Sequence, residues 1–258
     1  MIWVIQENIF KEKGHEEFIK AIMKSGVDYT IVKVVPFSHE ISPAITYSGK
    51  KIAFGSTTLM KITLKEGWNP GCYFNENFDA KIWLKAYGEN CLNFESVVCQ
   101  LKDVNFVGGS LFMRPCADLK QFTGKVFNEQ EFIKWKSEIK PVSEGGYSTI
   151  TPETWVAVAK PKKVFEEYRL FVVGGKVVTG SIYKIATDVI APPLPMNENV
   201  WNFAQDMVDI WIPHKVFVID IACTEEGLKV IEINCANSSG FYNCDVSKFV
   251  QEICELEE

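Results

Sequence analysis

The stretch that decides the fold reads VIDIACTEEGLKVIEIN and covers residues 218–234. Two runs rich in β-branched residues flank a short polar turn, and this pattern predicts a β-hairpin. A three-residue loop from Glu225 to Gly227, with glycine in the left-handed last position, places Asp220 opposite Glu232. Asn234 lies two residues further on and therefore shares a sheet face with Glu232. The hairpin thus brings together three side chains that carry oxygen donors.

Two carboxylates that face each other across a ladder have Cβ atoms roughly 5 Å apart and repel each other. A cation between them removes the repulsion, and oxygen ligands from Asp, Glu and Asn suit Mg²⁺ or Mn²⁺. A bulge in the hairpin gives a second interpretation, in which the two acids point apart on a solvent-exposed face. From these residues alone both interpretations stand.

The overall composition excludes several other classes of protein. The chain has 258 residues and a net charge of −6, without a basic stripe, which argues against nucleic-acid binding. No apolar run is long enough to cross a membrane, and the first residues lack the features of a signal peptide. Eight cysteines without a Cys-x-x-Cys pair and three isolated histidines argue against disulfides, zinc and a histidine-centred triad. We therefore expect a cytoplasmic protein with reduced thiols, and the sequence does not indicate its oligomeric state.

Periodicity in the first 100 residues alternates between strands and helices. We expect strands over residues 2–6, 29–35 and 51–55, and helices over residues 14–25 and 57–64. This order predicts a small α/β domain with a parallel core over residues 1–100.

The pattern changes after residue 100. The glycine pair Gly174-Gly175 is a strong turn signal between strands 166–173 and 176–185. The other expected elements are a strand–turn–strand over residues 105–114, helices over 129–139, 199–212 and 246–256, and a strand over 154–159.

Cationic residues gather near the end of the strand that reaches residue 114. Arg114 and Lys120 precede a turn made by Thr123 and Gly124. Guanidinium and ammonium groups bind phosphate oxygens, and such a turn presents backbone N–H groups to an anion. The alternative is a salt bridge for Arg114 and a solvated Lys120.

Strand alternation places Glu167 and Arg169 on one sheet face, and Lys184 follows on the return strand of that hairpin. These three side chains either form a plain surface cluster, which contributes little to stability, or line a polar cleft.

Taken in order, these groups resemble the ATP-grasp superfamily, especially its phage and bacterial clade marked by two arginines and a lysine. The resemblance covers residues 105–245. It is carried by Arg114-Pro115, Asp118, Lys120, Phe122-Thr123-Gly124, Glu167-Tyr168-Arg169, Gly175-Lys176-Val177-Val178, Gly180-Ser181, Tyr183-Lys184, Asp220, Glu232 and Asn234.

This resemblance implies an α/β (α+β) fold in which two subdomains, residues 101–160 and 161–258, close on ATP. Together they form an ATP-grasp domain over residues 101–258, preceded by a small Rossmann-like α/β domain over residues 1–100.

The resemblance also implies a role for each site residue. Asp220, Glu232 and Asn234 would hold one or two Mg²⁺ or Mn²⁺ ions. Arg114 stands where most ATP-grasp enzymes carry a Lys before Pro, and Lys120, Thr123 and Gly124 would belong to a loop over the phosphates. Val158, Ala159 and Lys160 would meet the adenine edge, and Glu167 the nucleotide. Arg169 and Lys184 would face the transferred phosphate, and Asn237, Ser238 and Ser239 the substrate.

The implied activity is an ATP- and Mg²⁺-dependent ligase that joins a carboxylate to an amine or thiol through an acyl phosphate. An amino acid, a peptide or another small molecule is the expected substrate. One alternative is a phosphotransferase with a hydroxyl acceptor. Another is a nucleotide-binding regulator without turnover.

Overall fold

The computed structural model describes residues 1–7, 13–35, 40–139, 150–189 and 195–258. These residues form two compact units, one made of residues 1–75 and 164–258 and the other of residues 76–163. The two ends of the chain therefore belong to one unit. The predicted division at residue 100, which separates them, stays a prediction.

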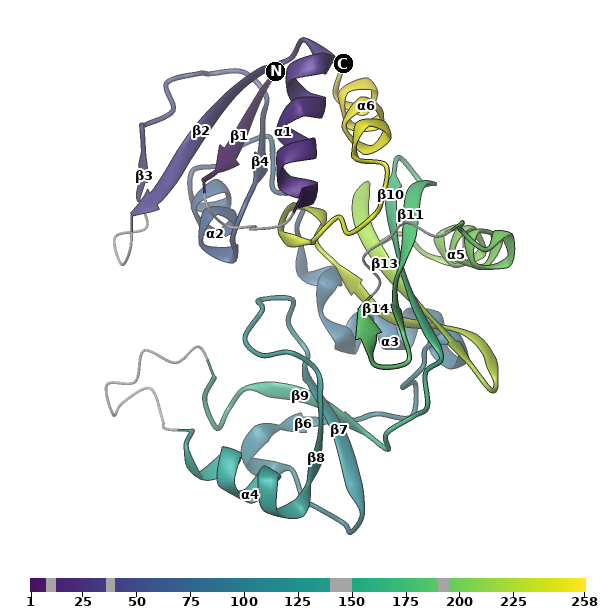
Figure 1. The fold of residues 1–258 in the computed structure, drawn as a ribbon. Helices are drawn as coiled ribbons and strands as arrows, with labels where there is room; N and C mark the ends of the chain where they lie inside the picture. Colours follow the sequence, from purple (N-terminus) through teal and green to yellow (C-terminus); the bar gives the residue numbers. More distant parts are fainter. Residues whose placement is uncertain (8–12, 36–39, 140–149, 190–194) are drawn as a thin grey trace. The chain divides into compact units, whose positions relative to one another are not determined.

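The first sheet of the first unit has a parallel core. Its strands are β1 (Ile2–Gln6), β2 (Asp28–Val35), β3 (Glu40–Ser42), β4 (Lys51–Phe54) and β5 (Pro70–Gly71), in the order β3-β2-β1-β4-β5 (Figure 1). Only β3 pairs antiparallel, at the edge beside β2. The helices are α1 (Lys13–Ser25) and α2 (Thr57–Lys65), and the Ser56 side chain caps α2. The predicted parallel α/β region is confirmed, whereas β3 and β5 are too short to leave a periodic signal.

The second sheet of this unit is antiparallel throughout. Its strands are β10 (Glu166–Val173), β11 (Lys176–Ile185), β12 (Asp188–Val189), β13 (Val216–Thr224) and β14 (Gly227–Asn234), in the order β12-β11-β10-β13-β14. The predicted hairpin across Gly174 and Gly175 is confirmed, and both glycines have the positive φ angles that this turn needs. Helices α5 (Glu198–Ile210) and α6 (Val246–Glu257) complete the unit, and α6 packs beside α1 (Figure 1).

A cluster of aromatic rings forms the centre of the first unit. Phe241 stacks on Phe18 of α1, Phe54 of β4 and Phe171 of β10, with ring centroids 5.3, 5.3 and 5.1 Å apart. All four side chains are buried. Aromatic contacts of this kind add to the free energy of burial, so the segment that follows β14 is anchored firmly in the core.

The second unit contains a four-stranded sheet with the order β6-β9-β7-β8. Its elements are α3 (Ala80–Tyr87), β6 (Val97–Gln100), β7 (Ser110–Pro115), β8 (Lys125–Asn128), α4 (Glu129–Ser137) and β9 (Trp155–Ala159), with short 3-10 turns η1 (Glu76–Phe78), η2 (Gly88–Asn90) and η3 (Leu101–Asp103). Its core includes Met113, Phe127, Phe132 and Val156. Among the described residues, no helix combines the length and apolar character needed to cross a membrane.

The predicted strand–turn–strand over residues 105–114 is wrong in its first half. Only the part from Ser110 onward forms a strand, and it pairs with β8 and β9. Gly108 and Gly109 both adopt positive φ, and Val107 before them is 90% exposed. An apolar residue in an exposed loop imitated a strand signal here, because sequence alone does not show burial.

Candidate active site

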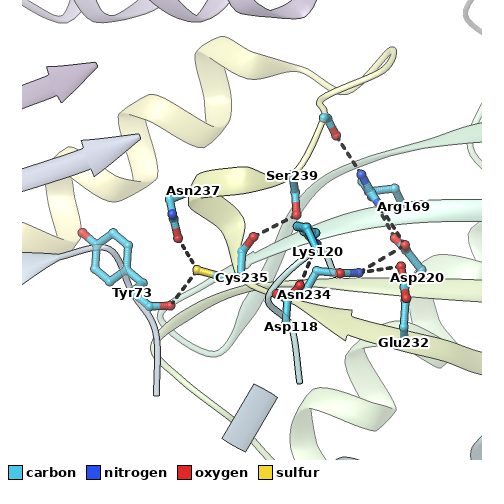
Figure 2. A network of polar contacts seen from close by, with 11 residues as sticks. Tyr73, Asp118, Lys120, Arg169, Asp220, Glu232, Asn234, Cys235, Asn237 and Ser239 are labelled. Carbon is cyan, nitrogen blue, oxygen red and sulfur yellow. Dashed lines mark hydrogen bonds and ion pairs between the residues drawn. The ribbon is translucent and has the colours of Figure 1, made fainter. Parts of the chain in front are cut away.

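A row of charged side chains crosses the second sheet of the first unit. Arg169 on β10 pairs in register with Asp220 on β13, and Asp220 pairs with Glu232 on β14. One cation and two anions therefore lie on neighbouring strands, and Asn234 follows two residues after Glu232 (Figure 2). The predicted pairing of Asp220 with Glu232 is confirmed.

The hairpin reaches this pairing by a different route from the predicted one. Thr224 pairs with Gly227, so the turn has two residues and not three. A bulge between Asp220 and Ile221 then shifts the register by one residue. The two differences cancel, and the acids still face each other. The Thr224 hydroxyl stabilises the tight turn by donating to the Gly227 carbonyl at 2.8 Å.

Arg169 and Asp220 form a buried two-point ion pair. Arg169 Nε donates to Asp220 Oδ1 at 2.9 Å, and Nη2 donates to Oδ2 at 2.7 Å. The side chains are 10% and 1% exposed. Burial raises the pKa of Asp220 to about 6, while Arg169 acts in the opposite direction. Burial lowers the pKa of Arg169, but the Asp220 charge outweighs it and raises that pKa well above its ordinary value.

Asn234 connects the two acids. Its Nδ2 donates to Glu232 Oε1 at 2.8 Å and lies 3.5 Å from Asp220 Oδ2 (Figure 2). The amide therefore already faces both carboxylates, and a turn of the amide would direct its oxygen to the same place. Two carboxylates and an amide oxygen are hard donors that fit Mg²⁺ or Mn²⁺. Within the described residues no three His, Cys, Asp or Glu side chains form another metal site.

A second polar group lies at the other end of β10. Glu167 accepts hydrogen bonds from Tyr183 Oη at 2.6 Å and from Lys184 Nζ at 2.5 Å. The Lys184 side chain is about one-third exposed and the Glu167 side chain less so. The structure thus brings the predicted residues Glu167 and Lys184 together on the sheet that carries the acidic pair.

The remaining predicted nucleotide residues belong to the second unit. Arg114, in β7, lies over the Trp83 ring with its Cζ 5.2 Å from the ring centroid. Lys120 forms an ion pair with the buried Asp118 at 2.7 Å. The other predicted positions differ in their exposure: Thr123, Gly124 and Lys160 are exposed, whereas Val158 and Ala159 are half-buried in β9.

The predicted substrate residues follow β14 in a short 3-10 turn, η5 (Ala236–Ser238). The Asn237 backbone carbonyl accepts from the Gly55 N–H at 2.9 Å, and its side chain accepts from the Cys235 thiol (Figure 2). Ser239 Oγ donates to the Cys235 carbonyl at 2.8 Å. Asn237 and Ser239 are buried and Ser238 is half-buried. The first two therefore stabilise the turn itself.

Sequence reasoning missed three groups around Arg169. Its Nη1 donates to the Gly240 carbonyl at 3.2 Å, and its Cζ lies 5.6 Å from the Tyr183 ring centroid and 5.0 Å from that of Tyr242. Tyr183 follows Ser181, the partner of Arg169 in the ladder, by two residues, so alternation was an available signal. The position of Tyr242 depends on a loop and leaves no periodic signal.

Solved structures with low sequence identity share this fold. The ATP-grasp ligase PsnB, solved with a phosphomimetic variant of its minimal precursor, Mg and ADP, is 10% identical, with a TM-score of 0.57 and coverage of 100% of this chain and 98% of that chain. The D-alanine–D-alanine ligase of Bacillus anthracis, complexed with ATP, is 16% identical, with a TM-score of 0.58 and coverage of 99% and 96%. A RimK domain ATP-grasp protein from Sphaerobacter thermophilus is 13% identical, with a TM-score of 0.56 and coverage of 98% and 94%.

No curated protein matches the chain in sequence. A family model of the ATP-grasp domain, family 3 of the clade marked by two arginines and a lysine, matches residues 12–253. The match covers nearly the whole chain and agrees with the shared fold, so the predicted superfamily and fold class are confirmed. The chain belongs to the ATP-grasp superfamily, in family 3 of this clade.

Proposed function

We propose that this protein is an ATP- and Mg²⁺-dependent ligase that joins a carboxylate to an amine or thiol and forms ADP. The γ-phosphoryl group of ATP passes to a carboxylate oxygen of the substrate, which gives an acyl phosphate and ADP. The amine or thiol then attacks the acyl carbon, and phosphate leaves. The observation that carries the proposal is the row of Arg169, Asp220 and Glu232, with Asn234 beside it, in a member of the ATP-grasp superfamily.

Asp220, Glu232 and Asn234 are the residues that would hold the metal. The orientation of the Asn234 amide toward both acids supports this assignment, because it places three hard donors around one point. When bound, a divalent cation bridges phosphate oxygens and neutralises the charge that develops on them.

Cationic side chains supply the other part of the electrostatic stabilisation. Within the described residues, the hydrogen bonds of Arg169 use three of its five N–H groups, so two remain for an anion. Lys184 is partly exposed and would reach the same phosphate. A preorganised donor of this kind contributes about 3–4 kcal/mol to the transition state, so its loss costs roughly 10²- to 10³-fold in rate. No protein nucleophile is needed.

The second unit would bind the rest of the nucleotide. Its cations, Arg114 and Lys120, would neutralise the phosphates, and the exposed Thr123-Gly124 turn would cover them. The backbone of Val158, Ala159 and Lys160 would meet the adenine edge. In the first unit Glu167 would contact the nucleotide, and the turn from Asn237 to Ser239 would face the substrate.

An amino acid or a peptide is the substrate class that we propose. Two structural relatives support this choice, since PsnB was solved with a precursor peptide and another relative is a D-alanine–D-alanine ligase. The likeness to both is in the fold, so the choice between free amino acid and peptide falls to the experiment.

The decisive experiment measures ADP release with a panel of amino acids and peptides in the presence of hydroxylamine. Hydroxylamine converts an acyl phosphate into a hydroxamate, which is detected by mass spectrometry. We expect a hydroxamate with the wild type, its loss in Glu232→Gln, and unchanged activity in Glu226→Gln, which alters an exposed turn residue of the same hairpin. A phosphorylated hydroxyl product with no hydroxamate would identify a phosphotransferase, and ATP binding without any turnover would identify a regulator.

A further inference from the structure

Two tyrosine side chains lie against the guanidinium of Arg169. The rings of Tyr183 and Tyr242, called here the tyrosine pair, stack with centroids 4.6 Å apart and an interplanar angle of 9°. Arg169 Cζ lies 5.6 Å from the Tyr183 centroid and 5.0 Å from the Tyr242 centroid. Both distances lie within the range of cation–π attraction, which is stronger where the cation is desolvated. Arg169 is such a case because it is buried.

The backbone at Tyr242 is unusual. Its φ angle is 50°, in the left-handed region that residues other than glycine seldom adopt. The neighbours on the amino-terminal side explain how the conformation is held, since Phe241 is fixed in the aromatic core and the Gly240 carbonyl accepts from Arg169 Nη1. Such a conformation persists only where the surrounding structure enforces it, and it is a marker of functional positions.

Tyr183 is held independently of Tyr242. It lies on β11, and its hydroxyl donates to Glu167 Oε2 at 2.6 Å. The ring that supports Arg169 from the sheet is therefore fixed by a hydrogen bond at its far end. Tyr242 adds a second ring from the loop after β14, so the guanidinium is held by groups from two separate segments.

The carboxylate that Arg169 engages is also a proposed metal ligand. Both oxygens of Asp220 accept from this arginine, and Asp220 is fully buried. A cation beside a buried carboxylate weakens the attraction of that carboxylate for a second cation. The strength of the Arg169–Asp220 contact therefore sets part of the cost of metal binding.

We infer that Tyr242 is a positioning residue which, with Tyr183, holds Arg169 on Asp220, so that this arginine is the resident counter-ion of the acidic pair and competes with a divalent cation for Asp220. The inference rests on the metal site of the proposed function. It assigns roles to Tyr183 and Tyr242 that the reaction itself does not require, because neither ring needs to touch a substrate.

The test measures the dissociation constant of Mn²⁺, by electron paramagnetic resonance of the free ion, with and without a non-hydrolysable ATP analogue. Tyr242→Ala removes the ring, whereas Tyr242→Phe keeps it with the same backbone demand. We expect Tyr242→Ala to bind Mn²⁺ roughly threefold to tenfold more tightly than the wild type, the fold-change of one lost cation–π contact at a partly buried site. Tyr242→Phe should stay within about twofold of the wild type, since the ring supplies the attraction.

A second variant tests the same competition directly. Arg169→Gln removes the positive charge beside both carboxylates, so its Mn²⁺ affinity should rise by more than about tenfold if it folds. Thermal unfolding of each variant shows whether the sheet is intact.

Equal or weaker Mn²⁺ binding in Tyr242→Ala, with normal binding in the wild type, overturns the inference and leaves the proposed function standing. Absence of Mn²⁺ binding in every variant, even with the ATP analogue, overturns the metal site itself and the inference with it. Tighter binding in Tyr242→Ala together with wild-type behaviour in Tyr242→Phe supports both.

Discussion

The buried ion pair between Arg169 and Asp220 gives the sharpest stability prediction. Asp220→Asn leaves the shape nearly unchanged but leaves a buried guanidinium without its counter-charge. Two charge-assisted hydrogen bonds, at 2.9 and 2.7 Å, join side chains that are 10% and 1% exposed. Each such bond contributes about 1.5–3 kcal/mol, and breaking a buried pair costs about 3–5 kcal/mol. We expect the free energy of unfolding to fall by about 3 kcal/mol or more.

Removal of both partners should cost much less than this sum suggests. The double variant Arg169→Met/Asp220→Leu leaves no buried charge, and apolar replacements of buried ion pairs are often close to neutral. The coupling energy of the double-mutant cycle should therefore be large and favourable, about 2–3 kcal/mol.

The assay is urea unfolding of the metal-free protein, followed by circular dichroism, with the slope of each transition compared between variants. Glu7→Gln is the matched control, because Glu7 and Lys33 form an exposed pair at 3.4 Å with side chains 40% and 71% exposed. This control should cost less than about 1 kcal/mol. If Asp220→Asn and the control shift the midpoint equally, the buried pair does not contribute as its geometry requires.

Three further predictions concern other parts of the molecule. Tyr73→Phe removes the 3.0 Å hydrogen bond to the buried Glu257 carboxylate and should cost about 1 kcal/mol in urea unfolding, whereas Glu257→Gln, which also loses its lysine partners, should cost more. Asn128→Ala removes the capping box of α4 and should lower the stability of the second unit by about 1 kcal/mol, seen as faster hydrogen exchange there. Burial and then Lys215 lower the pKa of His214 below 6.5, so the unfolded chain binds a proton at higher pH than the folded chain does. The free energy of unfolding should therefore fall as the pH drops through 6.5, and His214→Gln should flatten this decrease in a pH series of urea titrations.

Local patterns predicted the elements that lie within one stretch of chain. The hairpin of β10 and β11 was found because two glycines stand between two apolar strands. The pairing of Asp220 with Glu232 was found for a partly accidental reason, since a shorter turn and a bulge compensate each other. A bulge arises from packing on both sides of a strand, and no residue type in the hairpin announces it.

Contacts between distant segments could not be predicted in the same way. Arg169 was placed on a polar face, but its partner Asp220 is 51 residues away, and the pairing of β10 with β13 depends on the fold of the whole sheet. Tyr242 illustrates the limit further, because its ring position follows from the anchoring of Phe241 in the aromatic core and from a backbone conformation that tyrosine seldom adopts.

The charge of the row explains why both an internal and an external cation belong there. Two opposed carboxylates require a cation nearby, and Arg169 supplies one, which leaves the row of one cation and two anions with a net charge of −1. That charge is small enough for the sheet to fold without metal, and it still attracts a divalent cation. Binding of such an ion would change the row to +1, which favours the anionic phosphates of ATP over water. An arginine that neutralised both acids would abolish metal binding, whereas no arginine at all would leave a buried, repelling pair. The arrangement on β10, β13 and β14 lies between these two extremes, and the tyrosine pair determines how firmly the internal cation holds its place.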